Sequence, residues 1–166
     1  MELPTAGLKV LVTGTASDSH TWNLVYLQLF VEELGHRVVN LGPCVTGELL
    51  AEGCRRHRPD LVVMSSVNGH GYRDGLTAVT RLRAEPSLAG TPLVVGGKLG
   101  VAGERDPERA ALLLAAGCDA VFDDGDLDGL RDFLTATARG ALGPRADRTR
   151  AEGGRPDAVL PAGSSA

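Results

Sequence analysis

The sequence predicts an α/β fold in which five parallel strands form one doubly wound sheet with helices on both faces. Two observations predict it. Short runs of apolar and β-branched residues alternate five times with longer segments that are apolar at helical spacing. The strand-like runs are almost entirely apolar, which is typical of parallel strands buried on both faces.

The first part of the pattern contains two strands and two helices. Residues Leu8 to Thr13 predict a buried strand, and Leu24 to Leu34 predict a helix that the following glycine ends. A second strand covers Arg37 to Leu41. The next helix covers Thr46 to Arg56, and its first residue is a typical N-cap.

The alternation continues with a third and a fourth strand. Leu61 to Ser65 predict the third strand, and Tyr72 to Ala84 predict a helix that ends before Pro86. Pro92 to Val95 predict the fourth strand, which a Gly-Gly pair ends.

The last predicted elements are two helices around a short fifth strand. Glu108 to Ala116 predict a helix, Ala120 to Phe122 the strand, and Leu127 to Ala138 the final helix, with Asp126 as its N-cap. These elements place one domain in residues 1–140. Residues 141–166 are rich in Gly, Pro, Ala and Arg without periodicity, which predicts a disordered tail.

Composition excludes several classes of function. The net charge is -4, and no Lys/Arg cluster is interleaved with aromatic residues, so neither nucleic acid nor a membrane surface is an expected partner. No apolar run approaches the roughly 20 residues that span a bilayer. Cys44, Cys54 and Cys118 have neither disulfide-framework nor zinc-ligand spacing, so we expect a cytoplasmic protein.

Five such units most often adopt the flavodoxin-like (Rossmann-type) strand order 2-1-3-4-5. In that order the binding crevice lies outside the carboxyl ends of strands one and three. The loops at residues 13–20, 65–71 and 96–100 follow strands one, three and four, so all three belong to this edge of the sheet. We therefore expect the functional site there.

The first of these loops carries Asp18 and His20, which we expect to be exposed together. Loops display chemistry on a rigid scaffold. A carboxylate beside an imidazole fixes the tautomer of the ring and makes it a better metal ligand. This pair is the leading candidate for the site.

These residues resemble the cobalamin-binding domain of B12-dependent mutases and methyltransferases. The signature of that family is D-x-H-x-x-G, then S-x-L, then G-G, and this chain has Asp18-x-His20, a Ser-Ser-Val segment and a Gly-Gly pair in the same order. The chain between Leu8 and Leu134 is most similar to the small subunit of glutamate mutase (methylaspartate mutase). It departs from the signature at Asn23, where glycine is expected, and at Val67, where leucine is expected.

The resemblance implies a role for each motif. His20 would be the lower axial ligand of cobalt in place of dimethylbenzimidazole, and Asp18 would hold its other ring nitrogen. Ser65 or Ser66 would hydrogen-bond the displaced benzimidazole, and glycines would let the nucleotide tail pass close to the backbone. The implied cofactor-binding residues are Gly14, Thr15, Asp18, Ser19, His20, Asn23, Ser65, Ser66, Val67, Gly69, Gly96 and Gly97.

Four further residues each allow two interpretations. Trp22 and Tyr26 pack either near the corrin or in the core. His70 is either a loop residue or a corrin contact, and Lys98 either meets the phosphate of the cofactor or is solvated.

By the same resemblance, the chain is the cofactor-binding subunit of an isomerase and is inactive alone. The cofactor would be adenosylcobalamin, whose radical chemistry is its own. A separate barrel-shaped large subunit would bind the amino-acid substrate, form a heterotetramer with this chain, and interconvert L-glutamate and threo-3-methylaspartate. No catalytic acid/base pair is visible in the sequence itself.

Three alternatives share the fold. A corrinoid carrier of a methyltransferase system normally has a helical domain before the first strand, and few residues precede Leu8 here. An FMN-binding electron carrier would use Thr13-Gly14-Thr15 at its phosphate. A phosphoacceptor receiver domain needs an aspartate where the third strand ends in serine.

Overall fold

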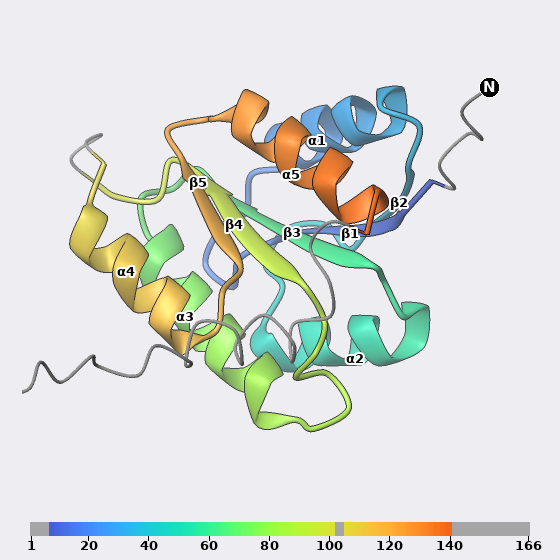
Figure 1. Ribbon diagram of the computed structural model, residues 1–166. Helices are drawn as coiled ribbons and strands as arrows, with labels where there is room; N and C mark the ends of the chain where they lie inside the picture. The colour runs from blue at the N-terminus through green and yellow to red at the C-terminus, as the bar shows by residue number, and fades with distance from the viewer. Residues whose placement is uncertain (1–6, 102–104, 141–166) are drawn as a thin grey trace, which may run out of the picture.

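The computed structural model, which describes residues 7–101 and 105–140, confirms the predicted fold. Five parallel strands form one sheet in the order β2-β1-β3-β4-β5 (Figure 1). The strands are β1 (Lys9–Gly14), β2 (Arg37–Asn40), β3 (Leu61–Ser66), β4 (Leu93–Gly97) and β5 (Ala120–Asp123). The helices are α1 (Trp22–Glu33), α2 (Gly47–His57), α3 (Gly71–Ala84), α4 (Pro107–Ala116) and α5 (Leu127–Ala138).

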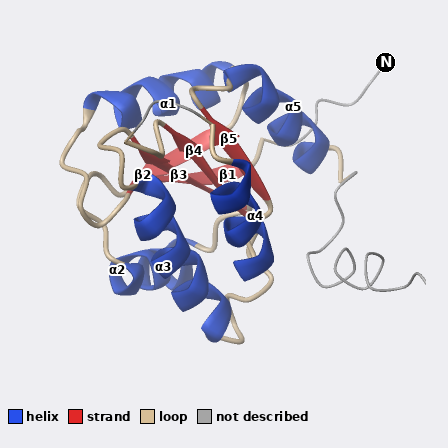
Figure 2. Cartoon of the chain, turned by 90° about the vertical axis from the view of Figure 1, so that its left-hand side faces the viewer, coloured by secondary structure: helices blue, strands red, loops and turns tan. Residues whose placement is uncertain are grey.

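Helices cover both faces of the sheet, so the molecule has three layers. Helices α1 and α5 lie side by side on one face, and α2, α3 and α4 cover the other (Figures 1 and 2). Strand residues alternate between two apolar clusters, since Val10 and Val12 pack toward α1 and α5 while Leu11 packs toward the other three helices. Alternation with burial on both faces explains the continuous apolar runs of the sequence.

Side chains cap two of the helices as the sequence predicted. The Thr46 hydroxyl accepts a hydrogen bond from the Leu49 N–H at the start of α2, and the Asp126 carboxylate accepts one from the Gly129 N–H at the start of α5. Each interaction satisfies a backbone donor that the helix leaves without a partner.

Four strands end later than the sequence predicted, with β1 reaching Gly14 and β5 reaching Asp123, and the extensions of β3 and β4 shape the site. Strand β3 continues through Ser66 and β4 through Gly97, because Ser65 pairs with Gly96 and Ser66 with Gly97 across the sheet. Serine and glycine are poor strand formers on their own, so this extension depends on pairing between strands. It carries the backbone of both strands into the predicted site.

Among the residues that the structure describes, no helix is both long and apolar enough to cross a membrane. The predicted tail, residues 141–166, lies outside the described residues. The division of the chain into a domain of residues 1–140 and a tail therefore stays a prediction.

Candidate functional site

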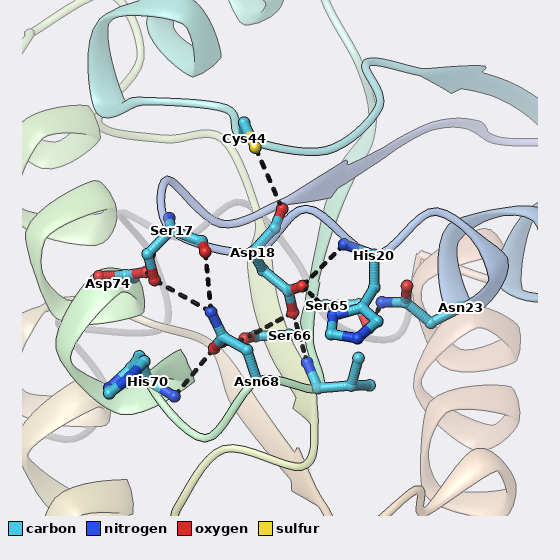
Figure 3. A network of polar contacts seen from close by, with 11 residues as sticks. Ser17, Asp18, His20, Asn23, Cys44, Ser65, Ser66, Asn68, His70 and Asp74 are labelled. Atoms are coloured by element: carbon cyan, nitrogen blue, oxygen red, sulfur yellow. Dashed lines mark hydrogen bonds and ion pairs between the residues drawn. The ribbon is translucent and has the colours of Figure 1, made fainter.

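The loop after β1 meets the loop after β3 at the carboxyl edge of the sheet (Figure 3). The two candidate residues of the first loop have different surroundings. The Asp18 side chain is buried, with 1% of its surface exposed, whereas the His20 ring is 49% exposed. The prediction that both are exposed is wrong for Asp18, because its carboxylate turns inward to bond the second loop. His20 stays at the surface above it.

Asp18 receives hydrogen bonds from both loops. Its Oδ1 accepts from the His20 backbone N–H at 2.9 Å and lies 2.6 Å from His20 Nδ1. Its Oδ2 accepts from the Val67 backbone N–H at 2.6 Å and lies 3.1 Å from the Ser66 hydroxyl. The carboxylate thus joins the histidine to the end of β3.

Burial raises the pKa of the Asp18 carboxyl, but the hydrogen bonds from Val67, His20 and Ser66 lower it more, so the net pKa lies below the usual value. An ionised Asp18 can only accept a hydrogen bond, so the Nδ1 of His20 carries its hydrogen and donates it. The lone pair is then on Nε2, and no hydrogen bond to Nε2 is present within residues 7–101 and 105–140. This arrangement can donate to a metal from an exposed ring.

A second set of contacts clamps the two loops together. Asn68 donates from Nδ2 to the Ser17 carbonyl at 3.0 Å, and its Oδ1 accepts from the His70 backbone N–H at 3.0 Å (Figure 3). Asp74 accepts from the Ser17 backbone N–H at 3.1 Å and also from the Ser17 hydroxyl. These contacts fix the loop that carries the Asp18–His20 pair.

Sequence reasoning missed these clamping residues. Asn68 bonds the backbone two residues on, as asparagine does in a turn, and the Asn-Gly pair was a signal that could have indicated this. Asp74 is 57 residues from Ser17, and its role has no local signal.

A mostly apolar slot of about 210 Å³ opens beside the Asp18–His20 pair, on the face of the sheet that α1 and α5 cover. It lies against the carboxyl ends of β3, β4 and β5. Five predicted site residues line it, namely Asn23, Ser65, Val67, Gly96 and Gly97. Its far wall comes from β5 and α5, with Phe122, Leu127 and Leu130, which sequence reasoning missed because nothing local distinguishes them from core residues.

The two glycines at the end of β4 lie close to the backbone of the neighbouring strands, and Gly97 is required there. Gly97 has a φ of +103°, and a Cβ there would lie 2.2 Å from the Ser66 carbonyl oxygen. A Cβ at Gly96 would lie 3.0 Å from the Phe122 carbonyl oxygen. Gly96 shares a face of β4 with Val94, which packs with α1 and α5, so its missing side chain leaves space at the slot.

Asn23 and Ser65 form the polar part of the slot. Asn23 Nδ2 donates to the Ser65 hydroxyl oxygen at 3.0 Å, and both residues are at least 95% buried. Because Ser65 accepts from Asn23, its own proton can be donated to a ligand in the slot. Asn23 Oδ1 is buried with no hydrogen-bond partner in the described part of the chain. Buried polar atoms are rarely left unpaired, and because Asn23 lines the slot, this oxygen is available to a polar group there.

The remaining predicted residues do not line the slot. Gly14 faces Pro43 and the Gly42 carbonyl, and Thr15 is buried beside it, so neither of them lines the slot. Ser19 is exposed, Ser66 turns to Asp18, and Gly69 packs near Val101 with a φ of +86°.

The structure places the four residues for which the sequence left two interpretations open. Trp22 and Tyr26 are 63% and 55% exposed and line the slot, so they lie outside the core. Lys98 is exposed and also lines the slot. His70 is an exposed residue at the start of α3.

Fold and site together define a class of protein: an α/β domain that presents a carboxylate-held histidine at the edge of a parallel sheet, beside a mostly apolar slot. The model of the family described as B12 binding domain matches residues 8–127. The chain belongs to this family of cobalamin-binding domains.

One curated relative is similar over most of the chain. Glutamate mutase sigma subunit 1 of Haloarcula marismortui is 28% identical over 145 residues, which are 83% of this chain and 93% of the relative.

Several known structures share the fold at low identity. A cobalamin-binding protein from Desulfitobacterium hafniense superposes with a TM-score of 0.61 at 18% identity, over 79% of this chain and 59% of that one. The monomethylamine corrinoid protein of Methanosarcina barkeri gives 0.58 at 19%, over 82% and 57%. A receiver domain of a histidine kinase from Syntrophus aciditrophicus gives 0.61 at 16%, over 82% and 94%. At these identities the likeness concerns the fold alone.

Proposed function

We propose that this chain is the cobalamin-binding small subunit of an adenosylcobalamin-dependent carbon-skeleton mutase, and that the mutase is glutamate mutase. In this proposal it works with a separate large barrel subunit in a heterotetramer. The large subunit binds L-glutamate and threo-3-methylaspartate, which the complex interconverts. The cofactor supplies the radical chemistry when bound. The family of the chain and its 28% identity to a glutamate mutase sigma subunit support the proposal.

The observation that carries the proposal is the Asp18–His20 pair beside the slot. Nδ1 of His20 is held 2.6 Å from a buried carboxylate, and the ring is exposed. The unprotonated Nε2 is a suitable donor to cobalt. The carboxylate of Asp18 orients the imidazole ring of His20 and keeps the ring basic through the hydrogen bond at Nδ1.

The slot fits the displaced nucleotide tail in its chemistry. Its wall is mostly apolar, as an aromatic benzimidazole requires, and the proton of Ser65 can be donated to the unprotonated ring nitrogen of that base. The absence of a side chain at Gly96 leaves room for the tail. Lys98 also lines the slot and would supply a cation for the phosphodiester.

Isotope labelling tests the ligand directly. The purified chain is loaded with cobalamin, the cobalt is reduced to the paramagnetic Co(II) state, and its electron paramagnetic resonance spectrum is recorded. Uniform labelling of the protein with the heavy nitrogen isotope should change the nitrogen splitting of the cobalt signal from a triplet to a doublet. His20→Ala should remove this response and weaken cobalamin binding, whereas His70→Ala should leave the response unchanged.

A nitrogen splitting of the cobalt signal that does not change on labelling would mean that the benzimidazole, not the protein, ligates cobalt. That result would refute the assignment of His20. Turnover of L-glutamate with the mutase large subunit of the same organism tests the finer proposal. Histidine ligation without such turnover would favour the corrinoid carrier of a methyltransferase system.

The loop after β1 does not favour FMN. A phosphate would need free N–H groups there, but the Gly14 N–H donates to the Gly42 carbonyl, the Ser17 N–H to Asp74 and the Asp18 N–H to the Thr15 carbonyl. The ionised Asp18 adds a negative charge to the same loop. We expect no FMN binding in an absorbance titration that detects cobalamin binding.

A further inference from the structure

Helix α1 carries a stripe of exposed apolar side chains that the slot does not explain. Trp22, Val25, Tyr26 and Leu29 are 63%, 52%, 55% and 61% exposed. Their spacing of three and four residues puts them on one side of the helix. We call these four residues the α1 stripe.

The α1 stripe is additional to the face by which α1 joins the core. Leu24, Leu27 and Val31 of the same helix are buried in the apolar cluster beneath it. A helix that is apolar on both sides is normally buried on both sides. Exposed apolar patches on a folded domain mark interaction surfaces.

The surroundings of the α1 stripe are acidic. Glu32 and Glu33 end α1, and Asp128 and Asp132 lie on the neighbouring α5, all of them exposed. Arg131 is the single cation in the two helices, and it is already paired with Asp128 at 2.8 Å. A partner that fits this surface therefore has apolar side chains bordered by Lys and Arg.

The α1 stripe is continuous with the candidate cofactor site. It begins two residues after His20, and Trp22 and Tyr26 also line the slot. A protein seated on the stripe therefore lies over the mouth of the slot. A partner that shares the cofactor with this chain must therefore contact the surface around the mouth of the slot.

We propose that the α1 stripe is the docking surface for the large subunit of the mutase, through an apolar groove bordered by basic residues. This inference rests on the proposed function. A second copy of the chain fits poorly, because a two-fold contact through the stripe would bring the acidic borders of the two copies together.

The test uses residues of the α1 stripe that do not line the slot. Val25→Asp/Leu29→Asp puts two carboxylates into the proposed interface, and cobalamin binding should stay within twofold of the wild type. The affinity for the mutase large subunit of the same organism, measured by isothermal titration calorimetry with cobalamin present, should fall at least tenfold. The wild-type affinity should also fall as salt is raised.

Leu112→Asp is the matched control, because Leu112 is 58% exposed on α4, on the opposite face of the sheet. It should leave the affinity unchanged. A double variant that binds the large subunit within twofold of the wild type would overturn the docking surface while leaving the proposed function intact. Wild-type chain that binds cobalamin but not the large subunit would instead overturn both the partner and the docking. Stripe-dependent self-association in sedimentation would assign the surface to a second copy and refute the proposal.

Discussion

At the scale of single residues, Asp18 does two things that one exposed acid could not. Its Oδ1 holds the imidazole of His20, and its Oδ2 ties the β1 loop to the end of β3 through Ser66 and Val67. The sequence could indicate the first contact, because the two residues are neighbours. It could not indicate the second, because 48 residues separate Asp18 from Ser66.

We predict that Asp18→Asn lowers the free energy of unfolding by about 1–3 kcal/mol at pH 7, since a buried charged acceptor loses part of its hydrogen bonding. The pKa of Asp18 is lower in the folded chain than its usual value, so its stabilisation is complete above that value. It is lost as the pH falls through the folded pKa. The difference between wild type and variant should therefore shrink below about pH 4 in urea denaturation.

Asp128→Asn serves as the control, because the Asp128 side chain is 89% exposed and should change stability by less than about 0.5 kcal/mol. A difference between wild type and Asp18→Asn that stays constant from neutral to acidic pH would contradict the role given to the Asp18 charge.

At the scale of elements, the ends of β3 and β4 decide the shape of the site. Pairing of Ser65 with Gly96 and of Ser66 with Gly97 continues the sheet beyond its apolar part. Residues that are weak strand formers thus lie in strands because their neighbours hold them there. The sequence placed the Gly-Gly pair at this edge but ended β4 too early, at Val95.

We predict different outcomes for alanine at the two glycines. Gly97→Ala should destabilise the chain by about 3 kcal/mol or more, because its φ of +103° suits glycine and the new Cβ would meet the Ser66 carbonyl. Gly96→Ala should cost about 1 kcal/mol but weaken cobalamin binding, because the methyl group adds bulk at the slot. Thermal unfolding and cobalamin titration separate the two effects. Equal loss of stability in both variants would contradict this account.

Helix α1 shows where periodicity stops being informative. The segment Leu24 to Leu34 predicted a helix correctly, but apolar residues occupy both of its sides. A pattern without contrast cannot say which side faces the core. The two faces became distinguishable only once the sheet was in place.

At the scale of the whole molecule, the sequence was sufficient for the class of fold and the order of strands. Alternating apolar runs and helical segments leave few topologies, and five such units most often adopt the strand order that is found. The slot was harder, because its walls come from α1, three strands and α5, which lie far apart in the chain. Phe122, Leu127 and Leu130 became site residues through folding alone.

We predict that cobalamin stabilises the entire domain. A ligand that binds only the folded chain at a hundred times its dissociation constant adds about 2.7 kcal/mol to the free energy of unfolding. Hydroxocobalamin should therefore raise the melting temperature of the wild type. FMN at the same concentration should leave it unchanged, and an equal rise with FMN would contradict a cobalamin-specific site.

The outermost strands of the sheet bear on how the chain behaves when concentrated. β2 and β5 have four residues each and form the two margins of the sheet. Short edge strands offer few unpaired backbone groups to another chain, which disfavours edge-to-edge aggregation and fibre growth. The domain can therefore expose the apolar side chains of α1 without also polymerising through the edges of its sheet.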